Sequence, residues 1–536
     1  MLHAMSGSKQ IAITLPKRAT TLAAARTGAM TLDVQLGQEV GYNFRGAPRD
    51  SHSDRTRVMY MTDGLLVAQA RKDPNFKNYA AVLVDEAHER GVPTDFLLMA
   101  LKNALDKNVK LKIVVMSATI DPGEFLAYFG PERTRVVNVD GAQMFNVAVK
   151  FNPIKFKSSN DLLEKALVIS NQALKEASDG SNAILFVPTT RDAVNGCRIE
   201  SVNRQVCKSL YGKMDKLEQD EILQFKDETL KTLYVATNVA ESSLTLPRLD
   251  FVVDTGLQVE VKWDPKIRCT EIKQNMATRA QIMQRIGRVG RVRPGYAILL
   301  YSEKTFKELP QYPPPALLNI DLSEHILSEA ASLNFASIKI NLSRLLTPPS
   351  SSQVDGAFRS LFLCGLLTDS KVSELGTLVL KAVERFRLSL WNALVVCAGY
   401  DMNHDAGDLA AILEAYGSAE LFLDMPGFDY KKYYVQGSDH ATLLRIFREL
   451  AEPLCGSRNS LLDQVTGVVF AAREYLQIIR SDERVHTSLY SMKPCDIAPL
   501  FPGAAARPPG KVKVGVYEQM ILRTSGKLEA ALLTWR

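Results

Sequence analysis

The sequence has no apolar run long enough to cross a membrane and no evident export signal. A membrane-spanning helix needs at least about 18 consecutive apolar residues, and no stretch approaches that length. The first ten residues, MLHAMSGSKQ, lack the long apolar core of a secretory signal. We therefore expect an intracellular protein, cytoplasmic or nuclear and not secreted, with no membrane partner.

Cysteine is sparse and shows no metal-binding or disulfide pattern. The seven cysteines are odd in number, scattered along the chain, and form no CxxC pair. They are Cys197, Cys207, Cys269, Cys364, Cys397, Cys455 and Cys495. This spacing argues against a disulfide framework or a zinc site, and it favours a reducing compartment.

An excess of charge of one sign is also nearly absent. Sixty-five basic residues are almost matched by 59 acidic ones, which gives a net charge of +6. This balance permits a polyanionic partner without requiring one. With 46% hydrophobic residues over a length of 536, the chain can form sizeable cores, and three or four domains are expected.

Short apolar, β-branched runs end abruptly in polar clusters, and a helical stretch follows each run. The runs occupy residues 80–84, 113–116, 183–187, 233–236 and 251–253. Continuous apolar strands that alternate with helices predict an α/β fold of parallel sheets covered on both faces. Ligands bind outside the carboxyl ends of such strands, so the polar clusters predict the position of an active site.

Two breaks divide the chain. Residues 151–160 (FNPIKFKSSN) are interpreted as a linker between two sheets, and the proline-rich LPQYPPP at 309–315 ends the α/β pattern. The sequence beyond it favours helices, with a wing expected near residues 369–375. After residue 480 only a proline- and glycine-rich loop is recognisable.

The strongest local signal is VLVDEAHER at residues 82–90, where an apolar strand ends in two adjacent carboxylates. Magnesium takes one or two carboxylates together with substrate phosphates, so we expect Asp85 to hold the metal through water. Glu86 would then orient and deprotonate the attacking water. A solvated acidic turn is the alternative. The preceding strand and the following His88, Glu89 and Arg90 favour the functional interpretation, with His88 in the catalytic set.

The second signal is QRIGRVGR at residues 284–291. Arginines three apart on a helix lie on one face, and arginines aimed at a γ-phosphate stabilise the charge that develops in phosphoryl transfer. We assign Arg288 and Arg291 to this arginine-finger role, and Gln284 to holding the γ-phosphate. A basic patch that touches only nucleic acid is the alternative; the glycines argue against a plain solvated helix.

The order and spacing of these motifs resemble the DEAH/RHA family of superfamily 2 helicases over residues 8–480. The matching segments are ITLPKR (13–18, motif Ia), MTDGLL (61–66, motif Ib), DEAH (85–88, motif II), SAT (117–119, motif III), ILFVPTTRD (184–192, motif IV), VATNVAESSLTLPRLDFVVDTG (235–256, motif V), QRIGRVGR (motif VI) and GSDHATLL (437–444, ratchet). Motif VI also resembles helicases of positive-strand RNA viruses, so a virus-encoded relative stays open.

The resemblance implies a domain order and a set of roles. It implies RecA-like domains at residues 1–150 and 151–322, a winged helix at 323–388, a ratchet-like domain at 389–480, and a tail at 481–536 as a remnant of an oligonucleotide-binding fold. The RNA-backbone contacts would be Lys17, Arg18, Thr62, Asp63, Thr189, Thr190, Thr237 and Asn238. Ser117 and Thr119 would couple nucleotide state to domain closure. The nucleotide would also meet Ser243, Thr245, Asp254 and Gly256. Residues 263–274 would form a β-hairpin near the point of strand separation.

Several of these residues have simpler interpretations. Lys17 and Arg18 could be a solvated pair, and Ser117 and Thr119 could cap the following helix. His440 is more often a structural residue than a ligand. The basic stretches at 150–157 and 507–513 are expected to be solvated surface.

The phosphate-binding motif GxxxxGK(S/T) is absent from the sequence. Gly7-Ser8-Lys9 resembles part of it, but Gln10 follows and leads into an apolar strand, so we interpret it as the turn before that strand. A sheet without its phosphate-loop strand would leave backbone groups unpaired. We therefore expect a truncated gene model, a fragment, or part of a longer polyprotein.

Two functions follow from the sequence. The first is an NTP-dependent RNA helicase that uses ATP and Mg²⁺, acts on RNA through its backbone, and leaves room for an activator protein. The second is a non-catalytic module that binds RNA or a partner without turnover. The missing phosphate motif favours the second function, and the intact DEAH and QRIGRVGR motifs favour the first.

Overall fold

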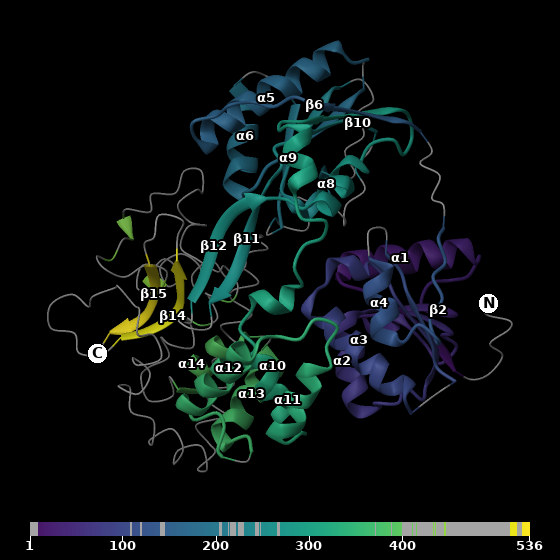
Figure 1. Cartoon of the computed structure of the whole chain (residues 1–536), viewed down its shortest axis with the longest axis vertical. Helices are drawn as coiled ribbons and strands as arrows, with labels where there is room; N and C mark the ends of the chain where they lie inside the picture. Colours follow the sequence, from purple (N-terminus) through teal and green to yellow (C-terminus); the bar gives the residue numbers. More distant parts are fainter. Residues whose placement is uncertain are drawn as a thin grey trace. The chain divides into compact units, whose positions relative to one another are not determined.

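The computed structural model describes most of residues 9–398 and two segments near the carboxyl end (Figure 1). The gaps are 108–109, 118–120, 140–144, 179, 203–205, 213, 215–220, 223–229, 242–245, 247, 265–268, 370 and 387. Beyond 398 the described residues are 410, 414, 432–433, 435, 444–445, 515–522 and 528–535. Thr119, Ser243, Thr245 and His440 lie outside the described residues, as does nearly all of the expected ratchet segment.

The first sheet has five parallel strands in the order β2-β3-β1-β4-β5. The strands are β1 (Gln10–Leu15), β2 (Val40–Asn43), β3 (Val58–Thr62), β4 (Tyr79–Val84) and β5 (Lys112–Val115). The connecting helices are α1 (Arg18–Thr31), α2 (Asp63–Lys72), α3 (Val92–Leu105) and α4 (Pro122–Phe129). The predicted α/β class is confirmed, and β1 begins directly after Lys9, as the interpretation of residues 7–9 required.

The register of this sheet brings polar residues to one edge. Leu15 pairs with Thr62, and Thr14 pairs with Val84, so the carboxyl ends of β1, β3 and β4 lie side by side. Strand β4 supplies Val82 and Val84 to the core, and both are completely buried. Because this strand is fixed by apolar packing on both faces, the carboxylates that follow it are held at the edge of the sheet.

The second sheet has six parallel strands in the order β6-β13-β10-β7-β9-β8. The strands are β6 (Val147–Phe151), β7 (Asn182–Phe186), β8 (Val206–Leu210), β9 (Thr232–Ala236), β10 (Leu249–Asp254) and β13 (Gly295–Leu299). Strand β6 begins at Val147 and pairs with β13, although the sequence placed residues up to 150 in the first domain. The boundary was predicted from the polar residues that follow β6, which resemble a linker. The strand itself was missed because it is only partly buried and has no clear alternation of apolar residues.

Helices cover both faces of the second sheet. They include α5 (Ser159–Glu176), α6 (Thr190–Val202), α8 (Arg279–Ile286) and α9 (Glu303–Glu308). On α5 the buried Leu163, Leu167 and Leu174 repeat at helical spacing and pack on one face of the sheet. Every residue of β7 and β9 is buried, which explains why these strands are continuous apolar runs.

A helical region follows the second sheet. It contains α10 (Ser323–Ala330), α11 (Phe335–Ser343), α12 (Ser351–Leu363), α13 (Glu374–Phe386) and α14 (Leu390–Ala398). An antiparallel bridge joins Leu367 to Val372, at the beginning of the segment where a wing was expected. None of the helices that the structure describes is long and apolar enough to span a membrane.

A third sheet has the order β11-β12-β14-β15. Strands β11 (Leu257–Asp264) and β12 (Cys269–Met276) are neighbours, and they contain the described part of the segment at 263–274 where a hairpin was expected; residues 265–268 lie outside the described residues. Strands β14 (Gly515–Leu522) and β15 (Leu528–Trp535) are antiparallel, and β14 pairs with β12. The tail was expected to be a remnant of an oligonucleotide-binding fold, and no strands were placed in it. Strand β14 pairs with β15, which follows it closely in the sequence, and also with β12, about 250 residues earlier.

Candidate functional site

The turn after β4 fixes the two adjacent carboxylates. The amide of Asp85 donates to the carbonyl of Thr14 (2.9 Å), and the amide of Ala87 donates to the carbonyl of Met116 (3.1 Å). The amide of Glu86 donates to the Asp85 side chain, with 2.8 Å from N to Oδ1. These bonds anchor the turn to both neighbouring strand ends, so the direction of the carboxylates is set by the sheet.

Glu86 occupies the left-handed backbone region, with φ 54° and ψ 33°. A non-glycine residue there is strained by about 1–3 kcal/mol, and such strain persists only where flanking contacts impose it. The Glu86 side chain is 35% exposed. Burial, followed by the negative charges of Asp85 and Glu89, raises the pKa of the Glu86 carboxyl. A half-buried carboxylate with a raised pKa is suited to accept a proton from water.

His88 connects the DEAH segment to the SAT segment. Its Nδ1 atom lies 3.0 Å from the hydroxyl oxygen of Ser117. Burial lowers the pKa of His88, so its ring is neutral near pH 7. Its Nε2 atom lies 3.3 Å from a carboxylate oxygen of Glu86 but makes no hydrogen bond among the described residues. The structure therefore places Ser117 in contact with motif II, whereas Thr119 is outside the described residues.

The predicted RNA contacts of the first sheet differ in accessibility. Arg18 is exposed, and Lys17 forms an ion pair with Glu89, with 2.9 Å from Nζ to Oε1. Thr62 is half-buried at the end of β3. Asp63 is only 1% exposed and accepts a hydrogen bond from Thr94. A buried carboxylate cannot contact RNA directly, so Asp63 positions the start of α2.

The predicted RNA contacts of the second sheet lie at strand ends. Thr189 caps α6, because its hydroxyl accepts from the amide of Asp192 (3.0 Å). Thr190 is exposed at the first position of α6. Thr237 is buried, and its amide donates to the carbonyl of Leu210 (2.9 Å), while the neighbouring Asn238 is exposed. Thr190 and Asn238 are therefore the accessible members of this set.

Motif VI is only partly helical. Helix α8 begins after its N-cap residue Thr278, which forms a capping box with Gln281, and it ends at Ile286. Only Gln284 of the predicted phosphate-contacting residues is therefore on the helix. Arg288 and Arg291 lie in the turns that follow, which corrects the expectation that they share a helix face. Arg288 donates to the carbonyl of Glu241, and Arg291 donates to the carbonyl of Gly287 (2.9 Å). Burial, followed by the charge of Arg291, lowers the pKa of Arg288 to about 10.

Arg285 is a residue that the sequence analysis missed. Its side chain is 1% exposed and lies 2.7 Å from carboxylate oxygens of both Glu241 and Asp254. Burial alone would lower the pKa of Arg285, but the charges of Asp254 and Glu241 outweigh this effect and raise it. A sequence signal for this residue was available. Arg285 occupies a helix position where an apolar residue is expected, and motif V contains two acidic residues that could pair with it.

Asp254 and Gly256 belong to the same buried network. Asp254 is 0% exposed and also accepts a hydrogen bond from the hydroxyl of Tyr301 (2.8 Å). Gly256 has φ 74°, and a Cβ atom there would lie 2.5 Å from the Tyr301 ring. These two residues were predicted to meet the nucleotide. In the structure the Asp254 carboxylate is completely buried and pairs with Arg285 and Tyr301.

No group of three or more His, Cys, Asp or Glu side chains that could enclose a metal occurs in the described parts of the chain. Asp85 and Glu86 are two adjacent carboxylates, and such a pair would suit Mg²⁺ shared with substrate phosphates. The printed sequence offers no GxxxxGK(S/T) to cradle those phosphates. The two carboxylates therefore fit the metal, and the described residues include no GxxxxGK(S/T) motif to bind the phosphates.

The family model that matches this chain and two relatives that match it by sequence are all described as helicases. Residues 160–293 match the helicase conserved C-terminal domain. A protein of Acanthamoeba polyphaga mimivirus, whose name assigns it to the ATP-dependent RNA helicases, is 32% identical over 378 residues, 67% of this chain and 53% of its own length. The ATP-dependent RNA helicase HrpA homolog of Haemophilus influenzae is 31% identical over 323 residues, 59% of this chain and 24% of its own length.

Two solved structures share the fold. The Escherichia coli DEAH/RHA helicase HrpB matches 97% of this chain and 68% of its own length, with a TM-score of 0.68 and 19% identity. A second structure of E. coli HrpB, described as a DExH-box NTPase, matches 92% of this chain and 55% of its own length, with a TM-score of 0.60 and 21% identity. The chain spans about half or less of the length of the two relatives matched by sequence.

Proposed function

This chain has the motifs and the fold of the DEAH-box superfamily 2 helicases, and we propose that it acts in an ATP-dependent RNA helicase. In this proposal, nucleotide hydrolysis drives RNA unwinding or the remodelling of RNA–protein complexes. The main evidence for this function is the turn after β4, where hydrogen bonds from both flanking residues hold Glu86 in a strained conformation. A plain acidic surface turn has no need for such constraint.

The chemistry we propose divides the roles among residues already placed. Asp85 would hold Mg²⁺ through water, and the metal would neutralise charge on the phosphates. Glu86 accepts the proton of the attacking water, and its raised pKa improves the match to neutral pH. Gln284, Arg288 and Arg291 would meet the γ-phosphate, with Arg285 holding motif VI against motif V.

RNA would be bound mainly through phosphate and sugar. Exposed Arg18, Thr190 and Asn238 are the accessible candidates for this contact, and Lys17 would exchange Glu89 for a phosphate. Such contacts predict sequence-independent and salt-sensitive binding. Specificity would then require other segments or an activator protein, and we propose a cytoplasmic or nuclear site of action.

A second candidate function is RNA binding without turnover. The absence of GxxxxGK(S/T) from the sequence favours it, because the backbone amides of that motif normally hold the β- and γ-phosphates. The retained Glu86 and the arginines of motif VI favour the enzyme, since a module that only binds RNA has no use for a general base.

Phosphate release by the whole protein that contains this chain tests the two functions. Mg²⁺-ATP is supplied with and without single-stranded RNA, and Glu86→Gln is compared with the exposed control Glu132→Gln. The enzyme predicts RNA-stimulated hydrolysis that Glu86→Gln abolishes and Glu132→Gln keeps. Salt-sensitive RNA binding without any Mg²⁺-dependent ATP binding would support the second function. Normal hydrolysis by Glu86→Gln would remove the catalytic assignment.

A further inference from the structure

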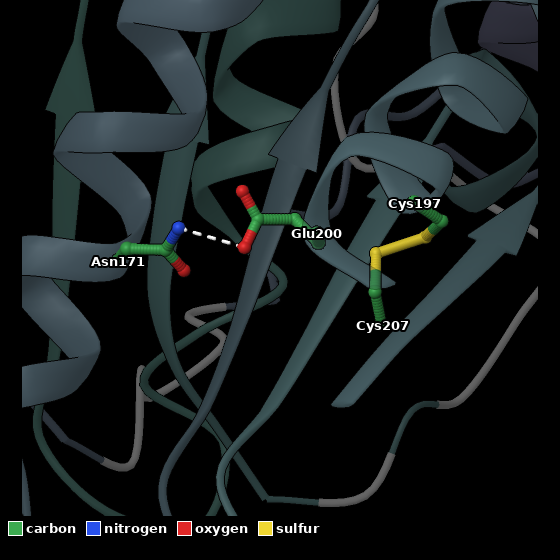
Figure 2. Close-up of a disulfide and its surroundings, with 4 residues drawn as sticks. All are labelled: Asn171, Cys197, Glu200 and Cys207. Atoms are coloured by element: carbon green, nitrogen blue, oxygen red, sulfur yellow. Dashed lines mark hydrogen bonds between the residues drawn. A yellow bond between two sulfur atoms is a disulfide. The ribbon is translucent and has the colours of Figure 1, made fainter. Parts of the chain in front are cut away.

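A disulfide lies in the second sheet, away from the proposed catalytic residues. Cys197 on α6 is bonded to Cys207 on β8, with the two Cα atoms 5.2 Å apart and a sequence separation of 10 (Figure 2). Both cysteines are half-buried, whereas Cys364 and Cys397, which are not part of a disulfide, are buried. The odd number and scattered spacing of the cysteines argued against a disulfide framework, and the Cys197–Cys207 bond corrects that expectation.

The disulfide joins an edge strand to the helix that covers it. Strand β8 is the last strand of the six-stranded sheet, and among the described strands it pairs with β9 alone. An edge strand has one hydrogen-bonded neighbour, so its other restraints come from side chains. Four of its five residues are half-buried. The bond from Cys207 to Cys197 is therefore a major restraint on β8.

The helix end has a second anchor that does not depend on sulfur. Glu200 is 1% exposed, and its carboxylate accepts a hydrogen bond from the side-chain amide of Asn171 on α5, with 2.8 Å between Nδ2 and Oε2 (Figure 2). This contact holds α6 on α5 whether the disulfide is closed or open. Opening the disulfide would thus loosen β8, which keeps its pairing with β9, and leave α6 in place.

Both elements joined by the disulfide lead to proposed RNA contacts. Helix α6 begins at Thr190, next to the capping Thr189. The last residue of β8, Leu210, accepts the backbone hydrogen bond of Thr237, which precedes the exposed Asn238. Loosening β8 would weaken the support of Thr237 and Asn238. The distance between the two proposed RNA-contacting segments would then be less firmly fixed.

We propose that Cys197 and Cys207 form a reversible redox site that controls how firmly the second sheet holds RNA; this role in RNA binding rests on the proposed function. In the oxidised state the disulfide fixes β8 on α6. In the reduced state β8 is held by its pairing with β9 but no longer by the covalent bond to α6, and RNA affinity falls. Half-exposure of both residues gives a small thiol or disulfide access to the pair.

The chemistry is thiol–disulfide exchange with a low-molecular-weight disulfide such as glutathione disulfide. One cysteine thiolate attacks a sulfur of that disulfide and forms a mixed disulfide, releasing one glutathione thiolate. The second cysteine thiolate then attacks the mixed disulfide, closes the Cys197–Cys207 bond and releases the second glutathione. The protein loses two electrons and two protons, and glutathione disulfide gains them as two thiols. Excess reduced thiol drives the reverse steps.

The experiment compares oxidised and reduced protein in two readouts. Glutathione buffers of defined ratio set the state, and thiol alkylation with mass spectrometry reports on Cys197 and Cys207. Hydrogen exchange of the amides of residues 206–210 reports on β8, and fluorescence anisotropy measures affinity for single-stranded RNA. Cys197→Ser and Cys207→Ser are compared with Cys364→Ala, a control at a cysteine outside the disulfide.

We expect reduction to accelerate exchange in β8 and to lower RNA affinity about fivefold, within the usual range of coupling between sites. The two serine variants cannot close the disulfide and should match the reduced protein in reducing buffer, and Cys364→Ala should respond like the wild type. Two free thiols at Cys197 and Cys207 in oxidising buffer, or equal β8 exchange in both states, would overturn the redox site. Faster exchange with unchanged RNA affinity would overturn its control of RNA. If no form of the chain binds RNA, the proposed function fails, and β8 exchange alone still decides the redox site.

Discussion

The Nδ1 atom of His88 lies 3.0 Å from the hydroxyl oxygen of Ser117, and this contact joins motif II to motif III. The two residues follow adjacent parallel strands, β4 and β5. Because the pKa of His88 is lowered by burial, the contact is one between a neutral ring and a hydroxyl. A change at the hydrolytic carboxylates can therefore reach the segment after β5 through one hydrogen bond.

Removal of the Ser117 hydroxyl should separate hydrolysis from unwinding. Ser117→Ala removes the contact with His88, worth about 1 kcal/mol, and we expect unwinding to fall roughly fivefold while RNA-stimulated hydrolysis changes by less than about twofold. A helicase assay and a phosphate-release assay on the same preparation measure both rates. Ser343→Ala, at an exposed serine, is the matched control. Equal decreases in the two rates would show that the contact serves the chemistry itself.

The acid side of the pH–rate profile should report on Glu86. A general base works when deprotonated, and the pKa of Glu86 is raised by burial and by the charges of Asp85 and Glu89. The rate of hydrolysis should thus be maximal above this raised pKa and fall as the pH drops through it. Glu89→Gln removes one of the charges that raise the pKa, so its acid limb should move to lower pH. Glu132→Gln should leave the limb unchanged, and an unmoved limb in Glu89→Gln would contradict the assignment.

The buried arginine of motif VI should be essential for the stability of the second sheet. Arg285→Met leaves Glu241 and Asp254 buried without their partner, which should lower the free energy of unfolding by about 3–5 kcal/mol. Urea denaturation followed by circular dichroism measures this change. Arg133→Met, at an exposed arginine, should stay within about 0.5 kcal/mol of the wild type. Addition of Glu241→Gln and Asp254→Asn to Arg285→Met should recover part of the stability; no recovery would mean that packing, rather than charge, explains the effect.

Salt dependence of RNA binding should identify the basic residues that touch phosphate. For single strands, the log–log slope of affinity against salt decreases by about 0.7 for each phosphate that the protein no longer neutralises. The double variant Lys17→Ala/Arg18→Ala should therefore flatten the slope by about 1.4 if both residues bind phosphate. Lys150→Ala/Lys157→Ala, in a stretch expected to be solvated surface, is the control. A similar flattening in both double variants would indicate diffuse electrostatic attraction.

Local patterns predicted the parts of the fold that depend on short segments. Strand β4 and its DEAH turn follow from an apolar run that ends in two carboxylates, and the structure places both where expected. The helical end of motif VI did not follow from its sequence. Spacing suggested that Arg288 and Arg291 share a helix, but α8 stops at Ile286, and the glycine that follows is the residue that ends it.

Contacts between distant segments decided the remaining roles. Asp63 and Asp254 were predicted to bind RNA and nucleotide, yet both are buried and hydrogen-bonded inside the protein. A motif gives the residue type and the strand end, but not which neighbour a side chain meets. The same limit applies to the Cys197–Cys207 pair, which depends on how α6 lies over β8.

The sequence by itself determined the α/β class, the DEAH/RHA resemblance and the position of Glu86 at a strand end, because each depends on order and spacing along the chain. Only the tertiary structure decided that Glu86 is held in a strained turn, that His88 meets Ser117, and that Arg285 neutralises Glu241 and Asp254. Burial, hydrogen bonding and charge pairing act through space, and a linear pattern does not encode them. His88 and Ser117 are 29 positions apart in the sequence, and Arg285 and Glu241 are 44 positions apart.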